Sequence, residues 1–422
     1  MSGPLNQTIA QKILAAKSGQ KEVVPGQFII AGVDLVMAND ITGPPAIEPF
    51  RATGKTKVFD PERVVLVPDH FTPNKDVASA EQCKTLRDFA AAQKTRYYEV
   101  GRLGIAHVSL PEDGLISPGM LILGADSHTC TYGALNAMGV GIGHTDAAAA
   151  MATGKTWLRV PETIRVELSG RLKGSASAKD AILTLLGMIG TDGARYQVLE
   201  FGGPGMASLP VEGRLTMANM TTEAGAKAGL FEADAETMAY LAAAEAPAGT
   251  PTGPDEDAAY VKKVELDLSR VVPVAAKPHS PANAAPVSEQ RQTKVDQVII
   301  GSCTNGRLSD LAVAAGILKD RQVAPDCRAV ILPGSQKVWL KALQAGYLEI
   351  FARAGAVVSP PSCGPCLGGH LGIMAQGEAC LSTTNRNFRG RMGHAESLVY
   401  LASPATAAAT AVTGRISSPE DL

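Results

Sequence analysis

Short apolar runs recur along the chain, and each is followed at once by a glycine or a proline. Four of them, rich in Val, Ile and Leu, cover residues 64–67, 120–123, 297–300 and 329–332. Runs that are apolar throughout are typical of strands buried on both faces of a parallel sheet. The segments between them show helical spacing, which predicts helices over 79–93, 146–158 and 310–318. This alternation of strands and helices indicates an α/β fold class.

The distribution of proline suggests where the chain divides. Residues 270–292 are rich in proline and have little periodicity, so we expect an extended linker there. A softer boundary lies near Pro161, after which Thr163 begins a new apolar–polar alternation. A chain of 422 residues suits roughly three domains of ~150 residues each. We therefore predict domains over 1–160, 161–269 and 293–422.

Composition excludes several classes of protein. Hydrophobic residues make up 45% of the chain, enough for a packed core, and 39 basic against 41 acidic residues leave a net charge of −2. This balance gives no reason to expect nucleic-acid binding and predicts no attraction to anionic membranes. The sequence shows no secretory leader and no apolar run of membrane-spanning length. Seven sparse cysteines are not a disulfide framework, so we expect a cytoplasmic protein.

Three cysteines lie in unusual loops. Cys303 follows an expected strand in Gly-Ser-Cys-Thr-Asn, and Cys363 and Cys366 lie in Pro-Pro-Ser-Cys-Gly-Pro-Cys-Leu-Gly-Gly. Inert burial fits poorly with flanking Gly, Pro, Ser and Asn. A redox pair is one alternative. Such a pair caps a helix, however, and the Pro-Pro-Ser before this pair and the Leu-Gly-Gly after it do not suit a helix. A zinc site that uses these three cysteines and His370 is another, although structural zinc prefers two close pairs of ligands and only one such pair is present here.

An iron–sulfur cluster is the interpretation that these loops favour most. Loops rich in Gly and Pro let backbone N–H groups turn toward the sulfur atoms. Three thiolates from Cys303, Cys363 and Cys366 would leave one iron of a cubane open to act as a Lewis acid. Cys130 also lies in a loop of this kind, so a fourth ligand stays an alternative at this point.

Histidines and carboxylates also gather in loops after expected strands. Asp69 and His70 follow the run 64–67, and a turn would let the carboxylate charge the imidazole as a general acid. Residues 126–128, Asp-Ser-His, follow the run 120–123, but their crowding does not suit a serine-hydrolase triad. His107 is a further candidate. A single histidine is more often structural than catalytic, but several such loops together favour a site.

An arginine-rich motif stands near the C-terminus. Arg386, Arg389 and Arg391 offer forked donors for carboxylates or phosphates. A solvated surface or an RNA-binding patch is the plainer alternative. The interleaved Asn385, Asn387 and Gly390 favour a shaped pocket for a small anion.

Taken together, these motifs resemble the aconitase superfamily. The resemblance rests on Asp126-Ser-His-Thr, Gly301-Ser-Cys-Thr-Asn, Cys363-Gly-Pro-Cys and Asn385-Arg-Asn-Phe-Arg-Gly-Arg391, in this order. It implies an aconitase-like fold of three α/β/α domains around a [4Fe-4S] cluster. The ligands would be Cys303, Cys363 and Cys366, with one iron not bound by cysteine.

The resemblance also assigns roles to single residues. Asp69 and His70 match the pair that protonates the departing hydroxyl, and His107, Asp126 and His128 match groups around the water at the cluster. The remaining matches are a substrate-carboxylate contact at Ser127, carboxylate-binding arginines at Arg386 and Arg391, the acidic partner of His128 at Glu223, and cluster-neighbouring asparagines at Asn219, Asn305 and Asn385.

By size the chain resembles the large subunits of the 3-isopropylmalate dehydratase and homoaconitase group. The resemblance implies a hydro-lyase that isomerises 2-isopropylmalate and 3-isopropylmalate in leucine biosynthesis. Homoaconitase and maleate-, citraconate- or dimethylmalate-type hydratases are alternatives, and a non-catalytic RNA- or zinc-binding protein is a further one. Pro45 stands near the place of a substrate-contacting glutamine of aconitases, which argues against citrate.

The resemblance further implies a partner. The swivelling domain of the family, which carries a catalytic serine, has no counterpart before Leu422. We therefore expect a separate small subunit that carries this domain and a small 2-hydroxy di- or tricarboxylic acid as substrate. Alone, the chain should bind the cluster but not turn over.

Overall fold

All four apolar runs form strands in the computed structural model, which describes residues 6–422. These strands are β3 (Val64–Val67), β5 (Leu121–Gly124), β14 (Gln297–Gly301) and β15 (Arg328–Leu332). Each belongs to a parallel part of a sheet and is almost wholly buried. Burial on both faces explains why their sequences are apolar throughout.

Two of the three predicted helices are present, and the third was predicted too long. They are α3 (Val77–Gln93) and α10 (Leu308–Leu318). The helix expected over 146–158 is α5 (His144–Thr153), and the strand β7 (Lys155–Arg159) follows it directly. Gly154 ends α5 in a left-handed conformation with φ of 65°, where the ring of Phe59 leaves no room for a side chain. The prediction missed this glycine cap.

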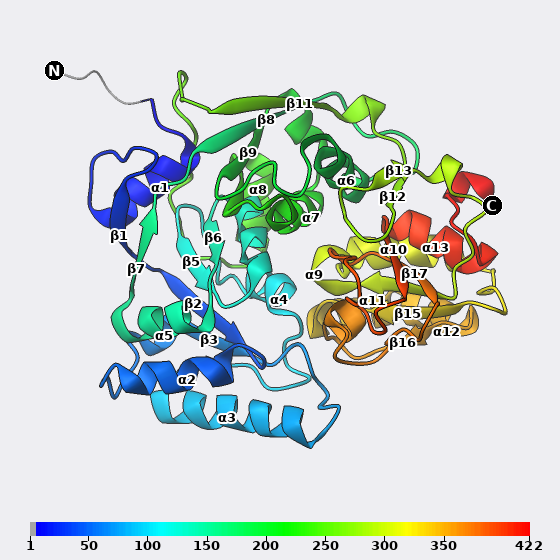
Figure 1. Cartoon of the computed structure of the whole chain (residues 1–422), viewed down its shortest axis with the longest axis horizontal. Coiled ribbons are helices and arrows are strands. Elements are labelled where there is room, and N and C mark those ends of the chain that lie inside the picture. The colour runs from blue at the N-terminus through cyan, green and yellow to red at the C-terminus, as the bar shows by residue number, and fades with distance from the viewer. Residues whose placement is uncertain (1–5) are drawn as a thin grey trace.

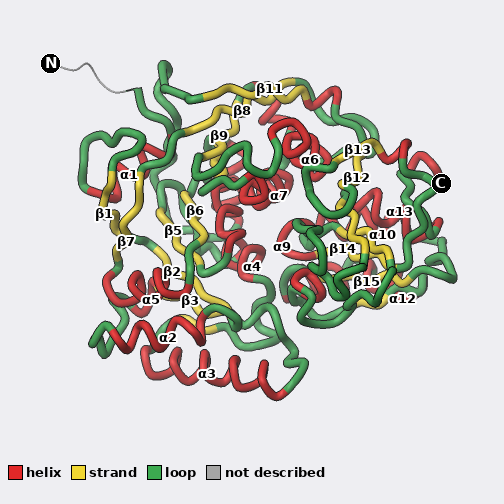
Figure 2. The backbone as a smooth tube through the Cα atoms, in the orientation of Figure 1, coloured by secondary structure: helices red, strands yellow, loops and turns green. Residues whose placement is uncertain are grey.

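The first unit has a five-stranded parallel sheet covered on one side by helices (Figures 1 and 2). The sheet order is β4 (Arg96–Tyr97), β3, β2 (Leu35–Asn39), β5 and β6 (Met138–Gly141). The helices α2 (Gly43–Ala52), α3 and α5 pack on its outer face. The other elements of the unit are α1 (Ile9–Ser18), α4 (Ala106–Glu112) and the antiparallel ribbon of β1 (Phe28–Gly32) and β7.

Alternate residues of this sheet enter two different cores. Val36 and Leu66 contact the outer helices, whereas Met37 and Val65 belong to the core shared with the second unit. Successive side chains of a strand point to opposite faces, so both faces of the sheet must be apolar. The sheet is therefore held between its own helices and the second unit.

The second unit has a four-stranded parallel sheet. Its order is β10 (Ala228–Phe231), β9 (Val198–Gly202), β8 (Thr163–Ser169) and β11 (Lys262–Asp267). Its helices are α6 (Ala178–Ile189), α7 (Val211–Asn219) and α8 (Ala235–Ala243). The long 3₁₀ helix η2 (Ser127–Leu135) of the first unit contacts both α7 and β10, which joins the two units closely.

The third unit has a seven-stranded sheet. Its order is β13 (Ala284–Pro286), β12 (Val274–Ala276), β18 (Leu398–Leu401), β17 (Ala379–Ser382), β14, β15 and β16 (Val357–Val358). Its helices are α9 (Ser302–Asn305), α10, α11 (Gln336–Gln344), α12 (Tyr347–Arg353) and α13 (Pro404–Thr413). The strands β12 and β13 lie in the proline-rich segment that we expected to be a linker, so part of that segment extends the third sheet.

The three units surround a common centre, where α4 and α9 lie close to one another (Figure 1). The carboxyl ends of β2, β3 and β5 and those of β14 and β17 lead into loops at this centre. Crevices outside the carboxyl ends of parallel strands are where α/β proteins bind ligands. Within residues 6–422, no helix is both long and apolar enough to cross a membrane.

Candidate active site

Loops from the first and third units together enclose a cavity of about 230 Å³. All but three of the residues predicted for the site line this cavity. They are Asp69, His70, His107, Asp126, Ser127, His128, Cys303, Cys363, Cys366, Asn385, Arg386 and Arg391. The three others, Asn219, Glu223 and Asn305, lie behind its wall. The fold therefore brings together motifs that lie up to 322 positions apart in sequence.

His70 carries a positive charge at one side of the cavity. Its Nδ1 lies 2.6 Å from Oδ1 of Asp69 and 3.6 Å from Oδ1 of Asp40. Burial opposes the imidazolium, but the Cys363 sulfur and the Asp69 carboxylate outweigh it and raise the pKa of His70 well above its ordinary value. Its Nε2 lies 3.8 Å from Oδ2 of Asp126. His70 can therefore donate a proton from Nε2 to a group bound in the cavity.

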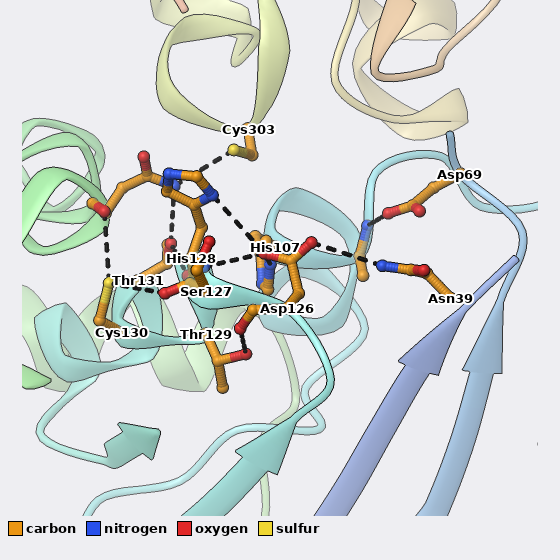
Figure 3. Close-up of polar contacts among 12 residues, drawn as sticks. Asn39, Asp69, His107, Asp126, Ser127, His128, Thr129, Cys130, Thr131 and Cys303 are labelled. Atoms are coloured by element: carbon orange, nitrogen blue, oxygen red, sulfur yellow. Dashed lines mark hydrogen bonds and ion pairs between the residues drawn. The ribbon is translucent and has the colours of Figure 1, made fainter. Parts of the chain in front are cut away.

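Asp126 is the centre of the polar contacts around the cavity (Figure 3). Its Oδ1 accepts from the backbone N–H of His128 at 2.8 Å and lies 3.1 Å from Nε2 of His107. Its Oδ2 accepts from Nδ2 of Asn39 at 3.4 Å. Burial alone would raise the pKa of Asp126, but His107 and His128 hold it well below its usual range. The residue is thus a carboxylate that can fix a water or hydroxyl through hydrogen bonds.

Glu223 orders two residues of the cavity wall from behind. Its Oε1 lies 3.0 Å from Nε2 of His128 and accepts from Nε of Arg386 at 2.8 Å. Burial would raise the pKa of this carboxyl, but the His128 hydrogen bond and the Arg386 charge lower it. The ionised Glu223 therefore keeps the Arg386 guanidinium at the cavity.

The three predicted cluster ligands come from two loops of the third unit. Cys303 lies in α9, at the carboxyl end of β14. Cys366 lies in the 3₁₀ helix η7 (Gly364–Leu367), and Cys363 directly precedes this helix. All three are buried free thiols that line the cavity. The backbone N–H of Cys363 donates to the carbonyl of Asp69 at 2.8 Å, so the ligand loop is tied to the His70 loop.

Amide and guanidinium donors are directed at these sulfur atoms. Nδ2 of Asn219 donates to Sγ of Cys303 at 3.2 Å, and Nδ2 of Asn385 donates to the same sulfur at 3.3 Å. Nη2 of Arg391 lies 4.0 Å from Sγ of Cys366. Such N–H donors stabilise negative sulfur, and hydrogen bonds to sulfur are one of the means by which proteins tune iron–sulfur clusters. The residues present therefore fit a cluster.

Asn305 differs from the other two asparagines. Its Oδ1 accepts from Nζ of Lys179, and its Nδ2 donates to Asp310 and Thr216. Its amide forms no hydrogen bond with any of the three sulfur atoms in the part of the chain that the structure describes. Asn305 is thus a neighbour of the cluster loop in sequence, while its side chain serves the packing behind that loop.

Cys130 has the environment of a structural thiol. Its Sγ donates to the carbonyl of Asn219 at 3.2 Å and lies 3.7 Å from that of Ser127. Figure 3 shows its sulfur apart from that of Cys303. Burial raises the pKa of Cys130 to about 12, and it does the same for Cys303, so the pKa does not distinguish the two thiols. What distinguishes Cys130 is that its thiol donates to backbone carbonyls and is not part of the cavity wall.

The arrangement of the thiols does not suit zinc. Zinc–sulfur bonds of about 2.3 Å in a tetrahedron would place the sulfur atoms roughly 4 Å apart. Among residues 6–422, the one compact group of potential ligands is Asp69, His70 and Cys363, with atoms within 4.8 Å of one another. The thiols of Cys303 and Cys366 lie outside that group. A larger bridging cluster matches this wider spacing better than a single ion does.

Several residues of the site were not among those predicted from the sequence. Asp40 accepts hydrogen bonds from the backbone N–H groups of Asp69, His70 and Phe71, and so shapes the acid loop. Asn39 supports Asp126. Both residues directly follow the apolar residues 35–38, so a polar pair after a strand was the signal that could have identified them.

A second cavity, of about 640 Å³, lies between the second and third units. It is larger and more apolar than the first, and its wall includes Lys179 and Asn305. Its described lining contains no cysteine and no histidine. The smaller cavity holds the acid, the carboxylates and the thiols, so we take that one as the active site.

Comparison with known proteins agrees with this site. The model of the aconitase family (aconitate hydratase) matches residues 11–414. The chain belongs to the aconitase family. This family assignment implies a [4Fe-4S] cluster, which the three thiols and their N–H donors suit.

Curated relatives in the family match this chain over nearly its full length. It is 56% identical to the 3-isopropylmalate dehydratase large subunit of Moorella thermoacetica, over 99% of this chain and 100% of the relative. It is 54% identical to 3-isopropylmalate dehydratase large subunit 1 of Pyrococcus furiosus, over 98% and 99%. Aconitase X of Thermococcus kodakaraensis shares the fold, with a TM-score of 0.52, 16% identity and 92% coverage of both chains.

Proposed function

We propose that this chain is the large subunit of a 3-isopropylmalate dehydratase, a hydro-lyase of leucine biosynthesis. The observation that carries the proposal is the cavity itself, where a charged histidine, a carboxylate and three thiols meet. Relatives of this name that match over nearly the whole chain support it. The reaction is the dehydration of a 2-hydroxy acid and its rehydration at the neighbouring carbon.

The cluster and its ligands are the first part of the proposed mechanism. Cys303, Cys363 and Cys366 would hold a [4Fe-4S] cluster, with one iron not bound by cysteine. Such a cluster supplies Lewis-acid chemistry that polarises a hydroxyl and a carboxylate of the substrate. Asn219, Asn385 and Arg391 direct N–H groups toward the ligand sulfur atoms and so stabilise their thiolate form.

Proton transfer is the second part. His70 holds a proton on Nε2 at the cavity while Asp69 and Asp40 hold Nδ1, so the imidazolium can protonate the departing hydroxyl. Asp126 stays ionised between His107 and His128 and orients the water that leaves or enters. These side chains are buried or nearly so, and this strengthens each electrostatic interaction at the reacting group.

Recognition of the substrate is the third part. Arg386, Arg391 and Ser127 line the cavity and would bind substrate carboxylates. Nε of Arg391 is buried and has no hydrogen-bond partner among the described residues, which leaves it free for a carboxylate oxygen. Pro45 lies inside α2 and is not part of the cavity wall, where Thr42 lies instead. This difference supports a substrate other than citrate.

The partner is the remaining part of the proposal. The relatives are named large subunits, which implies a small subunit. We infer that the small subunit carries the swivelling domain and closes the cavity with its catalytic base. We place the enzyme in the cytoplasm. We also propose domains over 1–160, 161–269 and 293–422, joined by the segment 270–292, part of which extends the sheet of the third domain.

A substrate assay tests the proposal. The chain is produced with its small subunit, reconstituted anaerobically with iron and sulfide, and supplied with 3-isopropylmalate, homocitrate or citraconate. We expect about four irons per chain and a preference for 3-isopropylmalate in kcat/KM. A preference for homocitrate or citraconate would instead assign the chain to one of those hydratases. One zinc per chain and no turnover would exclude the hydro-lyase.

A further inference from the structure

Lys179 is a buried cation that the proposed mechanism does not use. It lies in the first turn of α6 in the second unit, and its side chain is fully buried. A buried lysine must be satisfied by specific partners, because the desolvated ammonium is otherwise costly. All three of its hydrogen-bond acceptors lie in the third unit.

These acceptors belong to the two loops that surround the Cys303 sulfur. Nζ of Lys179 donates to the carbonyl of Thr383 at 2.6 Å, to that of Thr384 at 2.7 Å and to Oδ1 of Asn305 at 3.3 Å. Thr384 immediately precedes Asn385, whose amide donates to Sγ of Cys303. Asn305 stands two residues after Cys303 in α9. One ammonium group thus ties both loops together.

The geometry shows in which form the amine is held. A carbonyl or amide oxygen can only accept, so three such acceptors require three N–H donors, which is the ammonium form. Burial lowers the pKa of Lys179 to about 7, although Asp310 and Asp180 act in the opposite direction. The hydrogen-bond geometry, in which all three partners of Nζ are oxygen atoms, is that of the ammonium form.

The contact is also rigid on both sides. The carboxylate of Asp180, the next residue, accepts from the backbone N–H of Val274 in β12 and from Ser177, so the first turn of α6 is anchored to the third unit. The Asn305 amide cannot flip without loss, because its Nδ2 donates to Asp310 at 2.9 Å. The position of Lys179 is therefore fixed relative to the Cys303 loop.

We propose that Lys179 is a positioning residue for the cluster, which holds the Asn305 and Asn385 loops in place and sets one buried positive charge beside the cluster. A cluster with three thiolate ligands is anionic, and its reduction adds a further negative charge. A nearby cation stabilises the reduced form more than the oxidised form and so raises the reduction potential. This inference rests on the proposed cluster, although not on the identity of the substrate.

Three substitutions separate the charge of Lys179 from its hydrogen bonds. Lys179→Met removes both, Lys179→Gln keeps N–H donors without the charge, and Lys179→Arg keeps the charge. Lys227→Met is the control, because Lys227 is a partly buried lysine that interacts with Asp146 and Tyr196, away from the thiols.

The readout is the midpoint potential of the cluster in the large–small complex, from a redox titration followed by EPR. We expect a more negative potential for Lys179→Met and Lys179→Gln and a value near that of the wild type for Lys179→Arg and Lys227→Met. Unchanged potentials and unchanged EPR spectra in both neutral variants would overturn the inference. So would an equal shift in Lys227→Met.

The iron and sulfide content provides a second readout for a variant that does not bind the cluster. Circular dichroism establishes whether each apoprotein folds, and iron and sulfide are then measured per chain. Folded neutral variants that load poorly, with loading restored in Lys179→Arg, support the positioning role. Equal loss of iron in all three Lys179 variants contradicts it. A wild-type complex that binds no iron would contradict the proposed function itself, a result distinct from either of these.

Discussion

The cysteines of this chain differ in what surrounds each sulfur. Cys303 faces the side-chain amides of Asn219 and Asn385, whereas Cys130 faces backbone carbonyl oxygens. An N–H donor stabilises a thiolate, and a carbonyl acceptor stabilises a protonated thiol. Two cysteines that look alike in sequence therefore have opposite hydrogen-bond partners, and we propose that only Cys303 is a cluster ligand.

Substitution to serine tests this distinction between the two cysteines. We expect Cys130→Ser to keep the iron and sulfide content of the reconstituted wild-type chain, because serine can still donate to the Asn219 carbonyl. Cys303→Ser should lose most of the cluster, because it removes one of three thiolates. Chemical iron and sulfide determination and the visible absorption of the cluster provide the measurement. Loss of the cluster in Cys130→Ser would make Cys130 a ligand.

His70 allows a sharp test of the proton donor. His70→Asn preserves a polar side chain but removes the imidazole ring and the Nε2 proton that it donates. Loss of a general acid typically lowers kcat by ~10²–10⁴-fold, and we expect such a loss with little change in KM. His144→Asn, at an exposed position of α5, is the control and should retain full activity. A kcat within a few-fold of the wild type for His70→Asn would remove this residue from the mechanism.

The residues predicted for the site carry recognisable chemistry after apolar runs, and the fold brings most of them to one cavity. The prediction from the sequence did not include Lys179, because a lysine in an ordinary helical segment carries no sign that it will be buried against another unit. It also placed Asn305 at the cluster, whereas its side chain points to Lys179 and Asp310. Which way a side chain points depends on tertiary packing, and a single sequence does not contain that.

At the scale of elements, the junction between η2 and β10 depends on two facing glycines. A Cβ at Gly133 would lie 1.5 Å from the carbonyl oxygen of Gly229. We expect Gly133→Ala to destabilise the protein by ~3 kcal/mol or more, the upper range for overpacked cores. Gly316→Ala, in the exposed interior of α10 with open space around it, should instead be neutral or stabilising by up to ~1 kcal/mol. Thermal unfolding measures the Tm of both variants. A Tm for Gly133→Ala equal to that of Gly316→Ala would refute the close contact between the two glycines.

The first turn of α6 predicts a pH dependence of stability. Burial raises the pKa of Asp180 to about 6, although backbone donors at Val274 and Ser177 oppose the shift. A carboxyl whose folded pKa lies above its unfolded value stabilises at low pH, and that contribution is lost as pH rises through about 6. Asp180→Asn lacks this pH-dependent contribution to stability. The free energy of unfolding of the wild type, relative to that of the variant, should therefore fall by about 2 kcal/mol between pH 4.5 and 6.5.

Urea unfolding at the two pH values measures this difference. Because both proteins share every other titrating group, the comparison isolates Asp180. A difference that stays constant or grows with pH would show that the carboxyl is not held at a raised pKa. Glu265→Gln, on the exposed side of β11, provides a control without a pH-dependent difference.

Elements were easier to predict than their ends and their neighbours. The strands followed from apolar runs because burial on both faces leaves a plain signal. The error at residues 154–158 arose because a single glycine converts helix to strand, and that capping signal is weaker than the alanine-rich pattern before it. The proline-rich segment nevertheless contains two strands of the third sheet. β13, at the edge of the sheet, tolerates Pro286, and β12 beside it contains no proline.

At the scale of the whole molecule, the site is assembled from units that are far apart in sequence. The first unit supplies the acid and the central carboxylate, and the third supplies the thiols and arginines. The backbone hydrogen bond from Cys363 to Asp69 ties the third unit to the first, and the three hydrogen bonds of Lys179 tie the third unit to the second. Binding and chemistry thus depend on the relative position of the units, beyond the presence of each motif.

The same dependence extends to the proposed small subunit. The described residues around the cavity include an acid in His70 and an orienting carboxylate in Asp126, and we assign the base that removes the substrate proton to the partner. We therefore expect the reconstituted large subunit alone to show the absorption of its cluster but less than ~1% of the turnover of the complex, since loss of a general base costs ~10²–10⁴-fold. Titrating the small subunit into a fixed amount of large subunit should raise the rate until the two are equimolar.

Size-exclusion chromatography of the mixture reports whether a complex forms, so inactivity through failed assembly is distinguished from inactivity through failed chemistry. Full turnover by the large subunit alone would mean that its own cavity contains the base. Asp126 and His128 would then be the candidates for that role.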